Sequence, residues 1–150
     1  MSVKSQETNM RRLAVLLEQD LSYIGGYRES GPNGNKKTFL NVGKVFLRAL
    51  ARDLGLRDVT ISSNPGGIAV TGDCSMIGMW EDSGIYVCLH QPMYHRELVL
   101  CYRTVRHSRD FKGGYNHYLA RNDLEKWSYS QLLDALHELR KDGYAYERAA

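Results

Sequence analysis

The chain reads IYVCL at residues 85–89 and LVLCYRTV at residues 98–105, and these two runs decide its fold class. Apolar and polar side chains alternate along them with a period of two, which is typical of strands that bury one face of a sheet. The same alternation occurs at residues 59–61 and again at residues 68–80. Because short turns separate the runs, they predict a four-stranded antiparallel meander over about residues 58–106.

Upstream of these runs the hydrophobic spacing is helical. Leucines recur every three or four positions over about residues 6–21, and residues 38–54 carry a broader apolar face. Gly43 lies inside the second of these helices, where glycine costs about 1 kcal/mol relative to alanine. We expect a close approach by another backbone to offset that cost. Gly55, with Leu56 after it, predicts the end of the helix.

A third helix is predicted over about residues 128–142, where Ser128 and Gln131 have the spacing of a capping box. Residues 106–122 are polar and basic, and we expect a loop there. The order is then two N-terminal helices, a four-stranded antiparallel meander and a C-terminal helix packed on one face of the sheet, which is an α+β fold. A length of 150 residues suits a single domain over residues 1–150.

Composition favours a cytoplasmic protein. No apolar run approaches the roughly 18 residues that a membrane span needs, and the N-terminus lacks the apolar core of a signal peptide. The three cysteines, Cys74, Cys88 and Cys101, are odd in number and irregularly spaced, which predicts reduced thiols. The formal net charge of +3 is lower than is usual for a protein dedicated to duplex DNA. The spacing leaves the oligomeric state open.

The segment from Arg103 to Arg121 interleaves cations with aromatic rings. Cations contact phosphates and rings stack on bases, so this mixture is typical of surfaces that bind single-stranded nucleic acid. The alternative is a solvated connection whose tyrosines merely pack. The predicted nucleic-acid or partner-binding residues are Arg103, Arg106, His107, Arg109, Lys112, Tyr115, Asn116, His117, Tyr118 and Arg121.

A second basic loop spans residues 25–37 and contributes Tyr27, Arg28, Lys36 and Lys37. It lacks the G-x-x-x-x-G-K-[ST] spacing of a phosphate-binding loop, so nucleotide hydrolysis is not expected. A helix N-terminus beside two lysines could still hold an anion. The alternative is an ordinary connection between two helices. If the two basic loops are adjacent in space, they extend one positive surface.

Known catalytic and metal-binding spacings are missing from the sequence. Cys88 and His90 would share a strand face, with Cys101 on the neighbouring strand, yet the usual zinc spacings do not occur. A set such as Cys101, His107 and Asp110 has the residue types of a nucleophilic site, but such sites are recognised by geometry. We therefore expect no catalytic site, metal or cofactor. An enzyme whose site residues are dispersed along the chain stays an alternative.

Three runs stand out within residues 84–119: Ile85-Tyr86-Val87 to His90-Gln91, Tyr102-Arg103-Thr104, and Asp110-Phe111-Lys112-Gly113-Gly114-Tyr115-Asn116. On these runs the segment resembles small accessory domains associated with large polyvalent proteins of conjugative elements and phages. That group has no settled activity to transfer. The resemblance implies that this chain is a mobile-element protein concerned with host defence or with nucleic acid.

Two hypotheses about function follow. The leading one is a non-catalytic binding protein of a mobile genetic element that interferes with a host defence nucleoprotein, as anti-CRISPR and antirestriction proteins do. Its partner would be a protein or nucleoprotein complex, held through complementary surface patches. The alternative is a module that binds single-stranded DNA or RNA directly through the basic, aromatic segment, with an affinity that falls as salt increases.

Overall fold

The computed structural model describes residues 2–21, 35–64, 72–90, 98–110 and 114–141. These residues form helices and strands in the order helix, helix, five strands, helix, helix. The helices are α1 (Val3–Leu21), α2 (Asn35–Asp53), α3 (Arg121–Lys126) and α4 (Tyr129–Lys141). The strands are β1 (Arg57–Asn64), β2 (Asp73–Met79), β3 (Gly84–His90), β4 (Leu98–Val105) and β5 (His117–Ala120).

The strands form one antiparallel sheet in chain order, β1-β2-β3-β4-β5. The predicted α+β class and antiparallel meander are confirmed, but the strand count of four is wrong. The fifth strand and α3 both fall on residues 106–122 and just after, where a loop was expected. β5 has four residues and one buried side chain, Leu119, so it has no alternation of its own. It is a strand because Leu119 pairs with Leu100 of β4.

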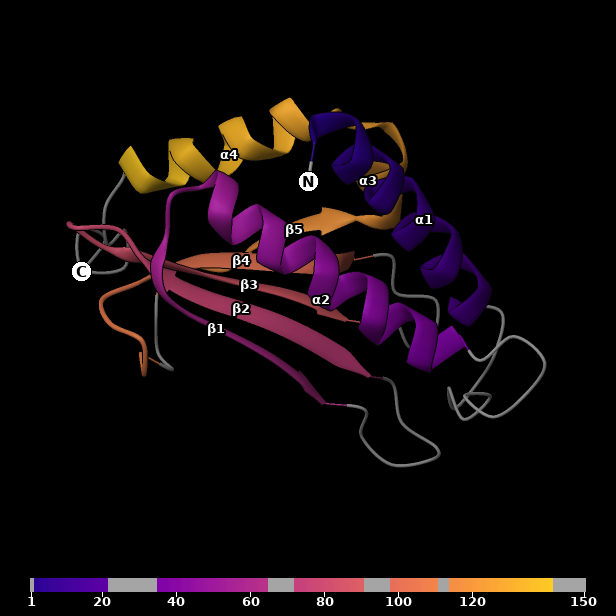
Figure 1. Cartoon of the computed structure of the whole chain (residues 1–150), viewed down its shortest axis with the longest axis horizontal. Coiled ribbons are helices and arrows are strands. Elements are labelled where there is room, and N and C mark those ends of the chain that lie inside the picture. The colour runs from indigo at the N-terminus through magenta and orange to yellow at the C-terminus, as the bar shows by residue number, and fades with distance from the viewer. Residues whose placement is uncertain (1, 22–34, 65–71, 91–97, 111–113, 142–150) are drawn as a thin grey trace.

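The helices cover one face of the sheet, and Figure 1 shows α1, α2 and α4 on the same side of it. The sheet side chains that face them, including Met76, Ile85, Val87 and Leu89, are buried. They share one hydrophobic core with the apolar face of α2, which contains Phe46 and Leu50. Helical packing of this kind leaves the other face of the sheet uncovered by the described helices. Among the described residues, no helix combines the length and apolar character that a membrane crossing requires.

Local signals end α2 and begin α4 as the sequence predicts. Gly55 has a φ of +72°, and the amide of Leu56 donates to Ala51 O while that of Gly55 donates to Arg52 O. This pair of bonds is the Schellman motif that closes a helix. Before α4, the Ser128 amide donates to Gln131 Oε1 at 2.8 Å and the Gln131 amide donates to Ser128 Oγ at 3.1 Å. The predicted capping box is therefore present.

Gly43 is needed for a different reason from the one expected. A Cβ at this position would overlap Sγ of Cys74 on β2. The close neighbour is thus a buried side chain of the sheet and not another backbone. Glycine lets α2 lie against β2 at this point, which sets the distance between the helix and the sheet.

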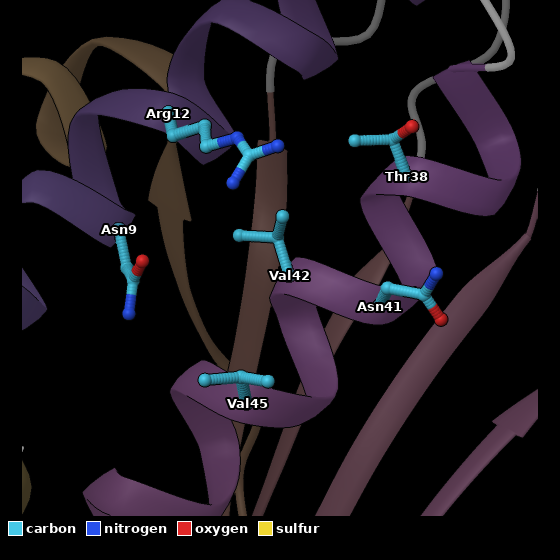
Figure 2. Close-up of a pocket in the computed structure, with 6 residues that line it drawn as sticks. All are labelled: Asn9, Arg12, Thr38, Asn41, Val42 and Val45. Atoms are coloured by element: carbon cyan, nitrogen blue, oxygen red, sulfur yellow. The ribbon is translucent and has the colours of Figure 1, made fainter.

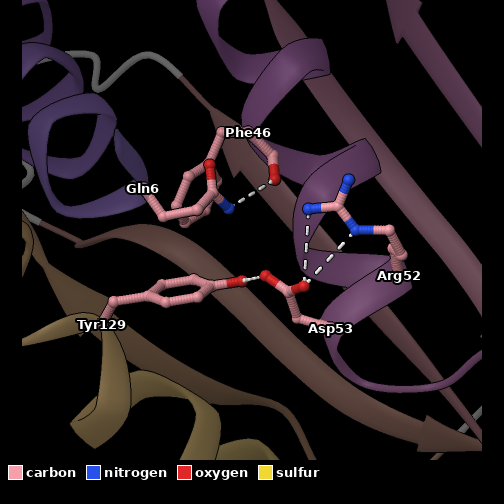
Figure 3. Close-up of polar contacts among 5 residues, drawn as sticks. All are labelled: Gln6, Phe46, Arg52, Asp53 and Tyr129. Carbon is pink, nitrogen blue, oxygen red and sulfur yellow. Dashed lines mark hydrogen bonds and ion pairs between the residues drawn. The ribbon is translucent and has the colours of Figure 1, made fainter. Parts of the chain in front are cut away.

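Polar residues join three helices inside this layer (Figure 3). The amide of Gln6, on α1, is fully buried and donates to Phe46 O of α2 at 3.1 Å. From α4, the hydroxyl of Tyr129 donates to Asp53 Oδ2 at 2.6 Å, and Asp53 also pairs with Arg52. Burial, and then the bond to Asp53, raise the pKa of Tyr129. These bonds satisfy buried polar groups and fix the mutual positions of α1, α2 and α4.

Candidate functional site

The face of the sheet opposite the helices carries small polar and aromatic side chains in two rows. Because partners in antiparallel strands point to the same side, the register aligns them across the sheet. One row crosses all five strands and consists of Ser62, Ser75, Cys88, Cys101 and Tyr118. The next row crosses four strands and consists of Thr60, Ile77, Tyr86 and Arg103. We call these nine residues the open face.

Arg103 is held in place at the centre of the open face. Its guanidinium lies over the ring of Tyr86, with Cζ 4.7 Å from the ring centroid. Nη1 donates to the carbonyl oxygen of Asp110 at 3.1 Å. A guanidinium fixed in this way presents a flat, charged surface on which a base can stack.

A tight turn over residues 106–110 lies at the end of β4 and folds back toward the open face. Asp110 is 6% exposed, and its Oδ2 accepts the backbone amide of Arg106 at 3.0 Å and lies 3.7 Å from Arg106 Nε. The amide of Asp110 donates to His107 O, and that of Arg109 to His107 Nδ1. These bonds brace the turn, and the side chains of Arg106 and Arg109 extend from it at the surface.

The turn and the open face enclose a cavity of about 550 Å³. Ser108, Asp110 and Asn116 border it on one side. Its wall on the sheet consists of Thr60, Ser62, Ser75, Ile77, Tyr86, Cys101 and Arg103. The volume is in the range of pockets that take small organic ligands, and polar groups converge on it.

An exposed tyrosine stands at the edge of this surface. Tyr118 on β5 is 47% exposed and lies opposite Cys101. The amide of Asn116 donates to its hydroxyl at 3.4 Å. Tyr115, two residues before β5, is 50% exposed. Together with Tyr86 and Arg103, Tyr118 places flat groups on three neighbouring strands of one face.

Two of the predicted binding residues lie away from the open face. Arg121 has a side chain that is only 17% exposed, and it pairs with Glu125 and donates to Ala14 O of α1. It therefore joins α3 to the helical layer. His117 stacks on Tyr102, with ring centroids 5.3 Å apart, and Tyr102 pairs with Val87 on the side that faces the helices. Lys112 falls outside the described residues.

The described part of the second basic loop lies away from the open face. Tyr27 and Arg28 fall outside the described residues, and Lys36 and Lys37 belong to the first turn of α2. Figure 1 places that end of α2 at the opposite end of the sheet from the turn that follows β4. The structure therefore does not extend the open face with these two lysines.

Burial keeps the thiols and Tyr86 protonated. It raises the pKa of Cys88 to about 11, and it raises the pKa of Cys101 against the opposing effects of Arg103 and Tyr118. Burial, and then Cys88, raise the pKa of Tyr86. At neutral pH the two thiols and the Tyr86 hydroxyl are therefore neutral donors on the open face. A protonated thiol is also a poor nucleophile and metal ligand.

Cys88 and Cys101 do lie opposite each other, and His90 lies opposite Asp73 at the end of β3. Even so, no group of three or more His, Cys, Asp or Glu residues in the described part of the chain is placed to hold a metal ion.

The sequence alone did not identify the polar residues of β1, β2 and β3 as site residues. The strands were predicted from apolar residues that alternate with polar ones. The polar positions in that alternation include Thr60, Ser62, Ser75 and Tyr86. Among the polar positions of β1 to β4, Arg103 alone was predicted as a binding residue, and the aromatic Tyr86 was the available signal for the others.

A second hollow, of about 360 Å³, lies between α1 and α2. Figure 2 shows the Arg12 side chain reaching from α1 into the space beside Val42 of α2. The described residues that line it are Asn9, Arg12, Thr38, Asn41, Val42 and Val45, which include one cation and no acid. It belongs to the helical layer and is separate from the open face.

The chain was compared with models of protein families, with curated proteins and with solved structures, and none of the three comparisons finds a match.

Proposed function

We propose that the chain is a non-catalytic binding domain whose open face binds single-stranded nucleic acid. The observation that carries the proposal is the Arg103 guanidinium, fixed over Tyr86 by its bond to Asp110. Tyr118 supplies a second flat group one strand away. Unpaired bases expose both of their faces, and they stack on aromatic rings and guanidinium planes.

The distribution of charge favours single-stranded over duplex nucleic acid as the ligand. A duplex hides the faces of its bases, so a protein that binds it depends mostly on phosphate contacts. Arg103 lies on the open face, and Arg106 and Arg109 extend from the turn beside it. Because Arg103 is assigned to stacking, two single-strand phosphate contacts remain, at Arg106 and Arg109, and they correspond to a slope of about −1.4 in a plot of log affinity against log salt concentration. Stacking would have to supply much of the remaining affinity.

Fluorescence anisotropy tests the proposal, with labelled single-stranded RNA, single-stranded DNA and duplex DNA at low and physiological salt. We expect single strands to bind more tightly than the duplex. Arg103→Ala and Tyr118→Ala should each weaken binding about tenfold, since stacking on one side chain contributes about 1–3 kcal/mol. Arg48→Ala is the matched control, because Arg48 is exposed on α2 in the helical layer.

Two results would contradict the proposal. One is a wild-type chain that binds no single strand even at low salt. The other is an equal loss of affinity in Arg48→Ala, which would indicate only the effect of total charge. Thermal unfolding of each variant shows whether a loss of binding comes from a loss of fold.

A second proposal follows from the resemblance of residues 84–119 to accessory domains of mobile elements. We propose that the chain interferes with a host defence nucleoprotein, in the manner of an anti-CRISPR or antirestriction protein. Such complexes hold guide RNA and displaced single strands, which a face of this kind could contact. A pull-down from host lysate should recover a nuclease or other defence component with the wild-type chain and lose it with Arg103→Ala. If the pull-down recovers no defence component, the proposed interference with host defence loses its support.

A further inference from the structure

We infer that the open face selects RNA over DNA by hydrogen bonds from its serine and threonine hydroxyls to the ribose 2′-hydroxyl. This inference rests on the proposed binding of single-stranded nucleic acid. The hydroxyls line the cavity between the 106–110 turn and the sheet, and RNA is the class of strand that this cavity would take.

Hydroxyl groups dominate the polar lining of this cavity. Thr60, Ser62 and Ser75 line it from β1 and β2, and Ser108 lines it from the turn. Ser62 Oγ and Ser75 Oγ are 3.0 Å apart and form one hydrogen bond, in which either can be the donor. Among the described lining residues, Arg103 is the one cation.

The Ser62–Ser75 pair has unused hydrogen-bonding capacity. Each hydroxyl has one proton and two lone pairs, so a bond between two of them leaves one proton and several lone pairs for a third group. A ribose 2′-hydroxyl is both a donor and an acceptor, and it can complete this arrangement. A deoxyribose presents only C–H bonds at the same position.

A phosphate fits this lining less well than a sugar does. Phosphate oxygens only accept hydrogen bonds and favour cations, whereas the carboxylate of Asp110 also borders the cavity. That carboxylate is held by Arg106. Phosphates are better placed beside the exposed arginines of the turn, with the sugar and base toward the hydroxyls and Tyr86.

The experiment measures the affinity of three single strands of one sequence, built from ribose, 2′-deoxyribose and 2′-O-methylribose, with uracil in all three. The RNA should bind about tenfold more tightly than the deoxyribose strand, the difference that one to two net hydrogen bonds produce. The 2′-O-methyl strand can accept but not donate and carries extra bulk, so it should bind less tightly than the RNA.

Single substitutions show which hydroxyls distinguish the ribose strand from the deoxyribose strand. Ser62→Ala and Thr60→Val each remove one hydroxyl from the cavity and should lower the affinity for the ribose strand more than the affinity for the deoxyribose strand, which reduces the preference for RNA. Ser63→Ala is the matched control, because Ser63 is also exposed on β1 but points to the other side of the sheet, opposite Cys74. It should keep the full preference.

The outcomes separate this inference from the proposed function. Equal affinity for the ribose and deoxyribose strands would overturn the selection of RNA and leave single-strand binding intact. A preference for RNA that survives both variants would overturn the role of these hydroxyls. Binding of none of the three strands would overturn the inference together with the proposed function.

Discussion

The hydroxyl of Tyr129 connects α4 to α2 through a short bond to the carboxylate of Asp53. Tyr129 is fully buried, and Phe46 packs edge-on against its ring. Tyr129→Phe keeps the ring and removes the bond, so it should lower the free energy of unfolding by about 1.5–3 kcal/mol, the usual contribution of a hydrogen bond to a charged group. Urea denaturation measures this change.

Tyr118→Phe is the control for that measurement. Its hydroxyl accepts a 3.4 Å bond from Asn116 at the exposed edge of the sheet, so its effect should stay within about 0.5 kcal/mol. Equal losses in the two variants would mean that the bond to Asp53 contributes nothing beyond the packing of the ring.

The sequence predicted the chemistry of several site residues but not the direction in which each one points. Arg103, Asn116 and Tyr118 were predicted to bind and lie at or beside the open face. Arg121, three residues after Tyr118, belongs to the helical layer. The difference arises because β5 pairs with β4 and the chain then turns into α3, and composition does not reveal that turn. The side of the sheet on which a residue lies depends on strand register, which is set by tertiary contacts.

The contact between Gly43 of α2 and Cys74 of β2 can be tested by substituting both residues. Gly43→Ala should stabilise an isolated helix by about 1 kcal/mol, but here the new methyl group would overlap Sγ of Cys74. Overpacking of a core costs about 1–3 kcal/mol, so we expect net destabilisation. Cys74→Ala removes the sulfur, and the double variant should recover stability relative to Gly43→Ala.

A double-mutant cycle by urea denaturation measures this coupling. The interaction energy between the two substitutions should favour the double variant. Additive effects would show that Cys74 does not limit the approach of the helix, and that Gly43 is needed for another reason.

Element boundaries were predictable where the signal is local. The Gly55–Leu56 ending of α2 and the Ser128–Gln131 start of α4 depend on a few neighbouring residues, and both occur as expected. β5 and α3 were missed because neither has a periodic pattern long enough to detect. β5 is stabilised by its bonds to β4, and α3 packs against α1, where Arg11 Nη1 donates to Leu124 O. Tertiary contacts of this kind override local propensity.

The stability of the chain should decrease in alkaline solution. Burial raises the pKa of Cys88 from 9.0 to about 11 and that of Cys74 to about 12. The folded chain therefore holds these protons more tightly than the unfolded chain does. Their contribution to the free energy of unfolding is fully present below pH 9 and is lost as the pH rises to about 11 for Cys88 and about 12 for Cys74.

Urea denaturation between pH 7 and pH 11 measures this decrease. Cys88→Ser removes one of the titrating thiols, so its free energy of unfolding should fall less steeply above pH 9 than that of the wild type. A variant with the same pH dependence as the wild type would show that Cys88 does not take part in this loss.

The 106–110 turn and the first turn of α2 lie at opposite ends of the sheet, which predicts that their cations contribute unequally to nucleic-acid binding. Arg109 extends from the turn beside the open face, and Lys37 is exposed in the first turn of α2, in the helical layer. Each phosphate contact on a single strand contributes about −0.7 to the slope of log affinity against log salt concentration. Arg109→Ala should therefore reduce the magnitude of the slope by about 0.7, while Lys37→Ala should leave it unchanged. The two substitutions remove the same charge, so the comparison separates the effect of position from that of net charge.

Anisotropy titrations at four or more salt concentrations give the slopes. Equal reductions in both variants would mean that the strand wraps around the end of the sheet to reach α2, and the interface would then extend beyond the open face.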